Sequence, residues 1–219
     1  LAQTLNELMK FKSLVTIFCL LFSFACIAQI PGIKSIKYLT TGATSGSGRL
    51  VIYDCKPAKD GGFIIAGIDS TGDPYNFDYN INFKRTSGTA MLAKTDSAGN
   101  IIWKTVIPLE VTQTTEIERA FCSVVQTGDG GYITSGFSGS LYSLSKQGII
   151  AKFSSTGTML WQKQYGGTGN DVFYNVIRCK TGGYLVSGTT SSNDGNVSGN
   201  HGLNDFWAMR INEDGDILW

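Results

Sequence analysis

The chain has 219 residues, of which 42% are hydrophobic and 16% charged, and its formal net charge is +1. This balance excludes the strongly basic surface typical of a protein that binds nucleic acid or anionic lipid. The 27 glycines indicate many turns, and the hydrophobic fraction is large enough for a core.

Residues 1–28 predict upstream sequence followed by a secretory signal peptide with its start at Met9. A basic segment precedes an apolar run, 13–28, that ends on a small residue. The run is shorter than the roughly 18 residues of a membrane helix, so we expect cleavage after Ala28, an exported protein and no membrane span in the mature chain. A lipoprotein cut before Cys26 is the alternative. A buried core helix is disfavoured because no polar face interrupts the run.

Export makes disulfides possible. Loss of the signal leaves three cysteines, Cys55, Cys122 and Cys179. An odd number cannot pair completely within one chain, and the absence of any Cys-x-x-Cys spacing disfavours a zinc site. We expect buried free thiols that pack as small hydrophobes.

Residues 29–49 follow the signal and predict an opening strand around 36–39 and then a Thr/Gly/Ser-rich linker. A repeat occupies residues 50–219. Its three units are approximately 50–120, 121–172 and 173–219.

Each unit begins with two apolar segments joined by a double glycine. These pairs are Gly61–Gly62, Gly130–Gly131 and Gly182–Gly183. Glycine supplies the positive φ that tight turns require, so each pair predicts a β-hairpin. Another glycine closes each second segment, and we expect it to permit close approach of a neighbouring backbone. Those glycines are Gly67, Gly136 and Gly188.

Each unit then contains a second hairpin that ends on a tryptophan. Trp103, Trp161 and Trp219 are 58 residues apart (161 − 103 and 219 − 161), and the turn glycines keep the same spacing. The turn glycines are Gly99, Gly157 and Gly215. We expect both sets to be structural, with the large tryptophan ring supplying contact area between units.

Two hairpins give four antiparallel strands in each unit, and repeats of this kind are typical of β-propeller blades. A four-stranded sheet that is apolar on both faces has to stack on its neighbours. A β-sandwich needs no 58-residue period, and the coils of a β-solenoid are much shorter. The predicted class is therefore all-β, a β-propeller-like array of four-stranded antiparallel blades. About three units are present, so we expect an incomplete ring and a fragment of a longer protein.

Five segments of the repeat carry a family resemblance. They are 129–133 (Asp-Gly-Gly-Tyr-Ile), 161–167 (Trp-Gln-Lys-Gln-Tyr-Gly-Gly), 181–188 (Thr-Gly-Gly-Tyr-Leu-Val-Ser-Gly), 192–202 (Ser-Asn-Asp-Gly-Asn-Val-Ser-Gly-Asn-His-Gly) and 205–207 (Asp-Phe-Trp). Together they resemble the large secreted repeat proteins of Bacteroidetes over nearly all of residues 50–219. The resemblance implies a propeller-like fold and delivery to the surface by type IX secretion. It supplies no catalytic residues.

One loop offers a weak calcium candidate. Asp194, Asn196 and Asn200 place hard oxygen ligands close together in the sequence. The alternative is that these residues simply favour turns, and we expect no other cofactor. His201, the only histidine, follows in the same loop, where we expect an exposed side chain without a role.

A basic residue recurs in the middle of each second hairpin, as Lys94, Lys152 and Arg210. Three equivalent cations could surround a channel and bind an acidic ligand. The alternative is that each side chain lies along the surface or pairs with a carboxylate on the next blade.

The connections of variable length, about 69–88, 137–147 and 189–204, are expected at the rim or on one face, where loops often carry function. No Gly-x-Ser-x-Gly motif predicts a hydrolase nucleophile. We therefore expect an exported non-catalytic scaffold or binding module for protein or glycan at the cell surface. The alternative is the N-terminal propeller part of a larger secreted hydrolase whose catalytic residues lie beyond Trp219.

Overall fold

The computed structural model describes residues 48–71, 88–107, 117–140 and 145–219. All of them belong to the compact unit Leu39–Trp219. The predicted signal peptide, the opening strand and most of the 69–88 connection lie outside the described residues. Within these ranges every regular element is a strand, and no helix of a length and hydrophobicity suited to crossing a membrane is found.

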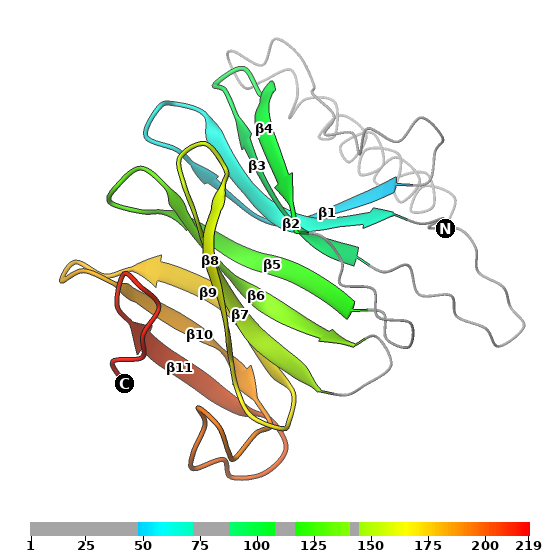
Figure 1. Ribbon diagram of the computed structural model, residues 1–219, viewed down its shortest axis with the longest axis vertical. Helices are drawn as coiled ribbons and strands as arrows, with labels where there is room; N and C mark the ends of the chain where they lie inside the picture. The colour runs from blue at the N-terminus through cyan, green and yellow to red at the C-terminus, as the bar shows by residue number, and fades with distance from the viewer. Residues whose placement is uncertain (1–47, 72–87, 108–116, 141–144) are drawn as a thin grey trace, which may run out of the picture. The chain divides into compact units, whose positions relative to one another are not determined.

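The strands form three antiparallel sheets in which consecutive strands are neighbours (Figure 1). The first sheet contains β1 (Gly48–Pro57), β2 (Phe63–Thr71), β3 (Gly88–Thr95) and β4 (Ile101–Val106). The second contains β5 (Ile117–Gln126), β6 (Tyr132–Ser140), β7 (Lys146–Phe153) and β8 (Met159–Tyr165). The third contains β9 (Asp171–Arg178), β10 (Tyr184–Thr190) and β11 (Asp205–Ile211). In place of a fourth strand it has one bridge, between Ile211 and Ile217.

The all-β class and the four-stranded antiparallel units are thus confirmed for the first two sheets. In each sheet the turn between strands one and two and the turn that follows strand three lie at one end. Strand two ends and strand three begins at the opposite end (Figure 1). We call these the turn end and the loop end.

The double glycines have two separate structural roles. The first glycine of each pair has a positive φ of 85–87° in a tight turn, as predicted. The second lies against the last residue of the third strand, because an added Cβ would come within 2.0–2.3 Å of a carbonyl oxygen there. These second glycines are Gly62, Gly131 and Gly183, facing Thr95, Phe153 and Ile211.

The first strand of every sheet contains a β-bulge at the same place. The extra residues are Tyr53 in β1, Cys122 in β5 and Tyr174 in β9. A glycine of the second strand pairs with the residue before each bulge, where an added Cβ would lie 1.8–2.0 Å from a carbonyl oxygen of the first strand. The close backbone approach predicted for Gly67, Gly136 and Gly188 is confirmed.

The sheets bury their apolar residues against each other in two clusters. The first joins the first and second sheets, with Trp103 of β4 edge-on to Tyr132 of β6 at 5.8 Å between ring centroids. The second joins the second and third sheets, where Phe173 of β9 lies 6.0 Å from Tyr165 of β8 and stacks on Trp207 of β11 at 4.7 Å. The inner strands of the second sheet therefore contribute to both clusters, as expected of a sheet that is apolar on both faces.

The three cysteines of the described region are free, as an odd number allows. The expectation that they are buried is wrong for Cys55, which is exposed because it lies in the outermost strand of the first sheet. Cys122 and Cys179 are half-buried. Burial raises the pKa of the Cys122 thiol to about 11, which keeps it protonated at neutral pH.

Candidate functional site

The second-hairpin turns are built identically in all three units. Gly99, Gly157 and Gly215 adopt φ values of 80°, 83° and 83°. A polar side chain three residues before each glycine accepts two backbone N–H groups and so closes the turn. These capping residues are Asp96, Ser154 and Asn212. Sequence reasoning missed them, although an Asp, Ser or Asn at one fixed position was a usable signal.

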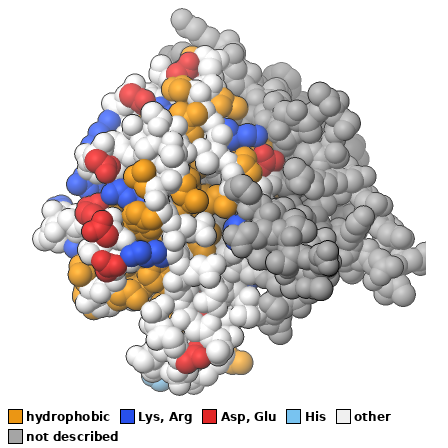
Figure 2. Space-filling model, in the orientation of Figure 1, with side chains coloured by type: hydrophobic (Ala, Val, Ile, Leu, Met, Phe, Trp, Pro, Cys, Tyr) orange, Lys and Arg blue, Asp and Glu red, His pale blue; other side chains and the backbone are white. Residues whose placement is uncertain are grey.

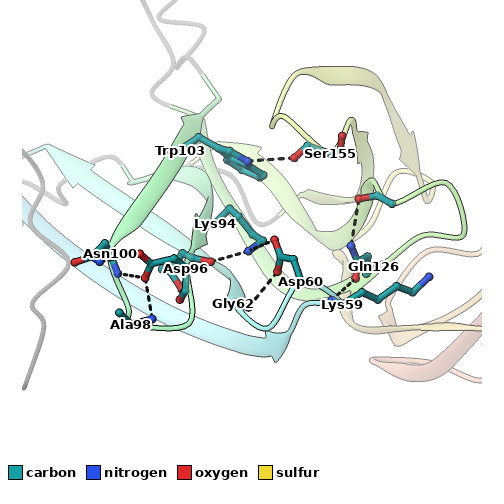
Figure 3. A network of polar contacts seen from close by, with 12 residues as sticks. Lys59, Asp60, Gly62, Lys94, Asp96, Ala98, Asn100, Trp103, Gln126 and Ser155 are labelled. Atoms are coloured by element: carbon teal, nitrogen blue, oxygen red, sulfur yellow. Dashed lines mark hydrogen bonds and ion pairs between the residues drawn. The ribbon is translucent and has the colours of Figure 1, made fainter. Parts of the chain in front are cut away.

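The tryptophan of one sheet packs on the glycine turn of the next. Trp103 covers Gly157 so closely that an added Cβ would lie 2.6 Å from the indole ring. Its Nε1–H donates to the Ser155 carbonyl at 3.2 Å (Figure 3). The Thr105 hydroxyl donates to the Gly157 carbonyl at 2.6 Å. One turn is thereby held by ring contact and two hydrogen bonds from the neighbouring sheet.

The same contact recurs between the second and third sheets. An added Cβ on Gly215 would lie 2.9 Å from the Trp161 ring, and the Tyr165 hydroxyl donates to the Gly215 carbonyl at 2.6 Å. Lys163 adds an ion pair with Asp216 at 2.8 Å. Trp219 differs, since 66% of its side chain is exposed. Trp103 and Trp161 thus pack between units as expected, whereas no turn of the described residues lies against Trp219.

The recurring cations bind the first-hairpin turn of their own sheet. Lys94, 3% exposed, lies 2.9 Å from Asp60 (Figure 3). Lys152 lies 3.4 Å from Asp129, and Arg210 donates to the Thr181 hydroxyl at 3.1 Å. Their charged ends are thus engaged within each sheet instead of being presented to a channel.

The alternative to a channel was a side chain that lies along the surface or pairs with a carboxylate on the next sheet. Among the described residues, the 4.0 Å contact of Lys152 with Glu213 is of the second kind. The pKa of Asp129 is lowered to about 2 because its carboxylate accepts hydrogen bonds from the Thr127 hydroxyl and the Gly131 N–H and lies beside Lys152. The turn end therefore carries fixed, paired charges.

A polar row joins the first strands of the three sheets. Asp54, Ser123 and Asn175 each follow a bulge, and the Ser123 hydroxyl lies 3.0 Å from Asp54 Oδ2 and 3.1 Å from Asn175 Oδ1. The Val124 N–H also donates to Asp54, at 3.0 Å. Although burial acts to raise the pKa of Asp54, hydrogen bonds from Lys56, Val124 and Ser123 hold it below its usual value. These hydrogen bonds hold β1, β5 and β9, the first strands of the three sheets, next to one another.

The loop end is organised around a buried carboxylate that sequence reasoning missed. Asp171 is fully buried. Its oxygens accept hydrogen bonds from the Ser192 hydroxyl at 2.8 Å, the Gly167 N–H at 2.9 Å and the Thr190 hydroxyl. In the sequence this aspartate stands among Gly, Thr and Asn, so it was not distinguishable from an ordinary turn residue. It anchors the 191–204 loop to the connection between β8 and β9.

The three calcium candidates accept hydrogen bonds from backbone N–H groups. Asp194 Oδ1 accepts the Thr168 N–H at 2.8 Å, and Asn196 Oδ1 accepts the Gly166 N–H at 3.3 Å. Asn200 Oδ1 accepts the Gly202 N–H at 2.6 Å. The arrangement is that of turn-forming residues. In the described part of the chain no group of three or more His, Cys, Asp or Glu side chains is placed to hold a metal ion.

A depression of about 330 Å³ lies beside this loop. Its lining consists of Thr190, Val197, Ser198, Gly199, Asn200, His201, Asp205, Phe206 and Trp207. His201 was expected to be exposed, and it is, but it is not isolated: its Nδ1 lies 3.0 Å from Asp205 Oδ2. That same oxygen accepts the His201 backbone N–H at 2.7 Å. The backbone hydrogen bond, and then the one from the ring, lower the pKa of Asp205, so the carboxylate is ionised at neutral pH.

The His201–Asp205 pair resembles the oriented half of a catalytic triad, but no nucleophile of the described residues is hydrogen-bonded to His201. Ser198 lines the same depression and makes no hydrogen bond to His201 among the described residues. The arrangement can hold a polar ligand through its unused donors and acceptors. It lacks the nucleophile–base contact that acyl transfer needs.

Exposed apolar side chains also repeat. The two residues before each tryptophan are 41–57% exposed, namely Ile101 and Ile102, Met159 and Leu160, and Ile217 and Leu218. Figure 2 shows a band of hydrophobic side chains on one face, bordered by acidic and basic side chains. The molecule thus offers apolar surface besides the depression, as interacting proteins commonly do.

No protein-family model and no curated protein matches this chain. The fold by itself defines the class of the described chain, which is an all-β protein of stacked antiparallel sheets.

Proposed function

We propose that the chain is part of an exported, non-catalytic, β-propeller-like repeat protein that binds protein or glycan at the cell surface. The observation that carries the proposal is the repeated contact between sheets, in which the tryptophan of one unit packs on the glycine turn of the next. Trp103 on Gly157 and Trp161 on Gly215 are the same contact one unit apart. A contact that propagates unit by unit is what a repeat scaffold requires.

The sheet order supports a propeller over a sandwich. Strands follow one another within each sheet, and the first strands of successive sheets are adjacent through the Asp54–Ser123–Asn175 row. Propeller blades are four-stranded sheets of this kind set around a central channel. A sandwich instead exchanges strands between two facing sheets.

Export and surface delivery rest on the sequence. The basic and apolar segments within residues 9–28 are typical of a signal peptide. The resemblance to secreted Bacteroidetes repeat proteins supports surface delivery by type IX secretion. Free cysteines do not argue against export, since the three described thiols need no partner for the fold.

A binding role is favoured over catalysis by the contrast between the two ends of the sheets. At the turn end the recurring cations bind groups of their own sheet, whereas the loop end of the third sheet carries a depression with polar groups that make no hydrogen bond to described residues. Rigid scaffolds commonly present their binding residues on such loops.

The test is to incubate the purified chain with an array of neutral and charged glycans and of exported proteins, and to assay the bound glycans for new reducing ends. We expect retention on one class of array without bond cleavage. Retention on neither class would overturn the binding role. Release of new reducing ends would overturn the non-catalytic assignment and favour the alternative, a secreted hydrolase.

A further inference from the structure

The loop-end depression has few ionisable side chains. Among the described residues its lining contains one carboxylate, Asp205, one histidine, His201, and no lysine or arginine. The two ionisable groups already face each other at 3.0 Å. An anionic ligand such as a phosphate would find no basic partner beyond that imidazole, and a cationic ligand would have to compete with it for the carboxylate. The lining therefore favours a neutral ligand.

The same lining offers several unused hydrogen-bonding groups. Ser198 Oγ, His201 Nε2 and Asp205 Oδ1 make no hydrogen bond to any residue of the described ranges. A hydroxyl both donates and accepts, a carboxylate oxygen accepts, and the free imidazole nitrogen does one or the other. Such a mixed set is satisfied best by a ligand that carries several hydroxyl groups.

Apolar side chains complete the depression. Val197 and Trp207, which are 7% and 9% exposed, form the buried wall of the depression. Phe206, which is 77% exposed, lies at the edge of the depression. A ligand that fits has to combine hydroxyl groups with an apolar face, and the ring of a pyranose does so, with its hydroxyls at the edge and its C–H groups on the faces. Its C–H groups can lie against apolar and aromatic side chains.

We propose that the loop-end depression binds one neutral sugar ring of a glycan. This inference rests on the proposed binding function and names the class of ligand for it. A volume of about 330 Å³ is at the small end of ligand pockets, which span about 300–1,000 Å³, and so suits a single ring. For a ligand of about a dozen heavy atoms we expect a dissociation constant on the order of 1 mM for the isolated ring.

The Asp171 network makes such a site rigid. Besides the Asp171 contacts, the Asn170 N–H donates to the Ser191 hydroxyl and the Gly169 N–H donates to the Ser192 hydroxyl, which ties the loop to the β8–β9 connection. The binding groups are thus carried by a segment whose backbone is held at several points. Pre-organisation of this kind lowers the entropic cost of binding.

The experiment is saturation-transfer NMR on the whole chain with the methyl glycosides of glucose, galactose and mannose as probes. Methyl glucuronide and glucosamine serve as the anionic and cationic counterparts. We expect transfer to at least one neutral glycoside, and weaker transfer to both charged sugars. Stronger binding of either charged sugar would overturn the inference.

Three variants locate the site. Ser198→Tyr fills the depression without removing any hydrogen bond, because the Ser198 side chain is exposed and unengaged within the described residues. We expect it to weaken binding at least tenfold. His201→Ala should weaken binding severalfold, while Ser155→Tyr adds the same ring to an exposed serine at the turn end and should change nothing.

Equal binding by Ser198→Tyr and the unmodified chain would overturn the inference, and so would transfer to none of the neutral glycosides. Neither result would by itself overturn the proposed function, which fails only if the arrays of proteins and glycans retain nothing. Retention on a glycan array that survives Ser198→Tyr would place the binding site elsewhere on the same molecule.

Discussion

The turn end and the loop end of the three sheets are constructed in opposite ways. At the turn end every feature recurs: a positive-φ glycine, a capping side chain, a basic residue bound to its own sheet and, in the first two units, a tryptophan on the next turn. At the loop end of the third sheet the Asp171 contacts do not recur in the described part of the second sheet, where Arg119 stands at the equivalent position. Contacts that recur determine how successive units stack. Contacts that occur in one unit determine which side chains that unit exposes to a ligand.

This difference explains why function should lie at the loop end. A residue that supports stacking cannot vary without weakening every neighbouring contact. A residue in the 191–204 loop affects one unit only, so a depression can form there without altering the scaffold. The following variants test this division, from the largest expected effect to the smallest.

The largest expected effect is at Asp171. Asp171→Ala leaves the Gly167 N–H and the Thr190 and Ser192 hydroxyls without their buried acceptor. We expect a loss of about 3–5 kcal/mol in the free energy of unfolding, measured by urea denaturation, since each unsatisfied buried group costs about 1–3 kcal/mol. Asp171→Asn retains one acceptor oxygen and should lose less. Asp214→Ala, at an exposed turn, should stay within about 0.5 kcal/mol of the parent.

A loss below about 1 kcal/mol for Asp171→Ala would mean that the buried carboxylate does not anchor the loop. The 191–204 loop would then not be held rigidly by Asp171, while the contacts between sheets would be unaffected.

The next comparison sets Trp161 against Trp219. Trp161 is half-buried on Gly215, and Trp161→Ala should cost about 3 kcal/mol in stability, near the lower end for large aromatic truncations. Trp219 is 66% exposed, so Trp219→Ala should cost less than about 1 kcal/mol. Equal losses from the two variants would show that the tryptophan–glycine contact is not what stabilises the stack. Both are measured by chemical denaturation of the whole chain.

The sequence was informative about the turn end because its signals are local. A double glycine or a Gly-x₃-Trp spacing specifies a hairpin within a dozen residues, and Gly61, Gly130 and Gly182 adopt the positive φ that this requires. Repetition at a fixed period then shows that Gly157 and Gly215 belong to the same element. The exposure of Trp219 was not predictable in this way, since it depends on which residues lie across from it.

The contacts that sequence reasoning missed link residues far apart in the chain. Asp54, Ser123 and Asn175 occupy one equivalent position of the three units, but an alignment of the units does not show that their side chains meet. Burial of Asp171 follows from how the loop folds over it, and residue type alone does not predict that. His201 and Asp205 are only four residues apart, but an irregular loop has no periodicity from which their contact could be inferred.

A third comparison separates backbone strain from the contact between sheets. Gly61 has a φ of +85° and open space around a would-be Cβ, whereas Gly157 has a φ of +83° and the Trp103 ring 2.6 Å from that position. Gly61→Ala should therefore cost about 1 kcal/mol for the left-handed backbone alone. Gly157→Ala should cost about 2 kcal/mol, because the indole has to move as well.

The difference can be assigned by a double-mutant cycle. In a Trp103→Leu background the extra cost of Gly157→Ala should disappear, while the cost of Gly61→Ala should remain. If the extra cost persists without the indole, the strain at Gly157 is intrinsic to the turn and the contact between sheets contributes little. The measurement is urea denaturation of the parent, the three single variants and the two double variants.

The smallest expected effect is a pH dependence from the turn end. The pKa of Asp129 is about 2 in the folded chain, against an ordinary value of 3.8, chiefly because its carboxylate accepts a hydrogen bond from the buried Thr127 hydroxyl. The folded state therefore binds fewer protons than the unfolded state between these values. The stabilisation is complete above pH 3.8 and is lost as the pH falls toward 2. Urea midpoints measured from pH 6 to pH 2 should show this decline.

Two variants connect the decline to this turn. Asp129→Asn removes the titrating group, and Thr127→Val removes the hydroxyl donor while keeping a side chain of similar shape. Each variant should therefore show a smaller decrease of the urea midpoint between pH 4 and pH 2. The effect is small because the Asp129 side chain is 58% exposed and solvent screens its partners. An unchanged slope in both variants would assign the acid sensitivity to other carboxylates with lowered pKa values, such as Glu213, whose Tyr184 and Gly183 hydrogen bonds lie at the same end of the third sheet.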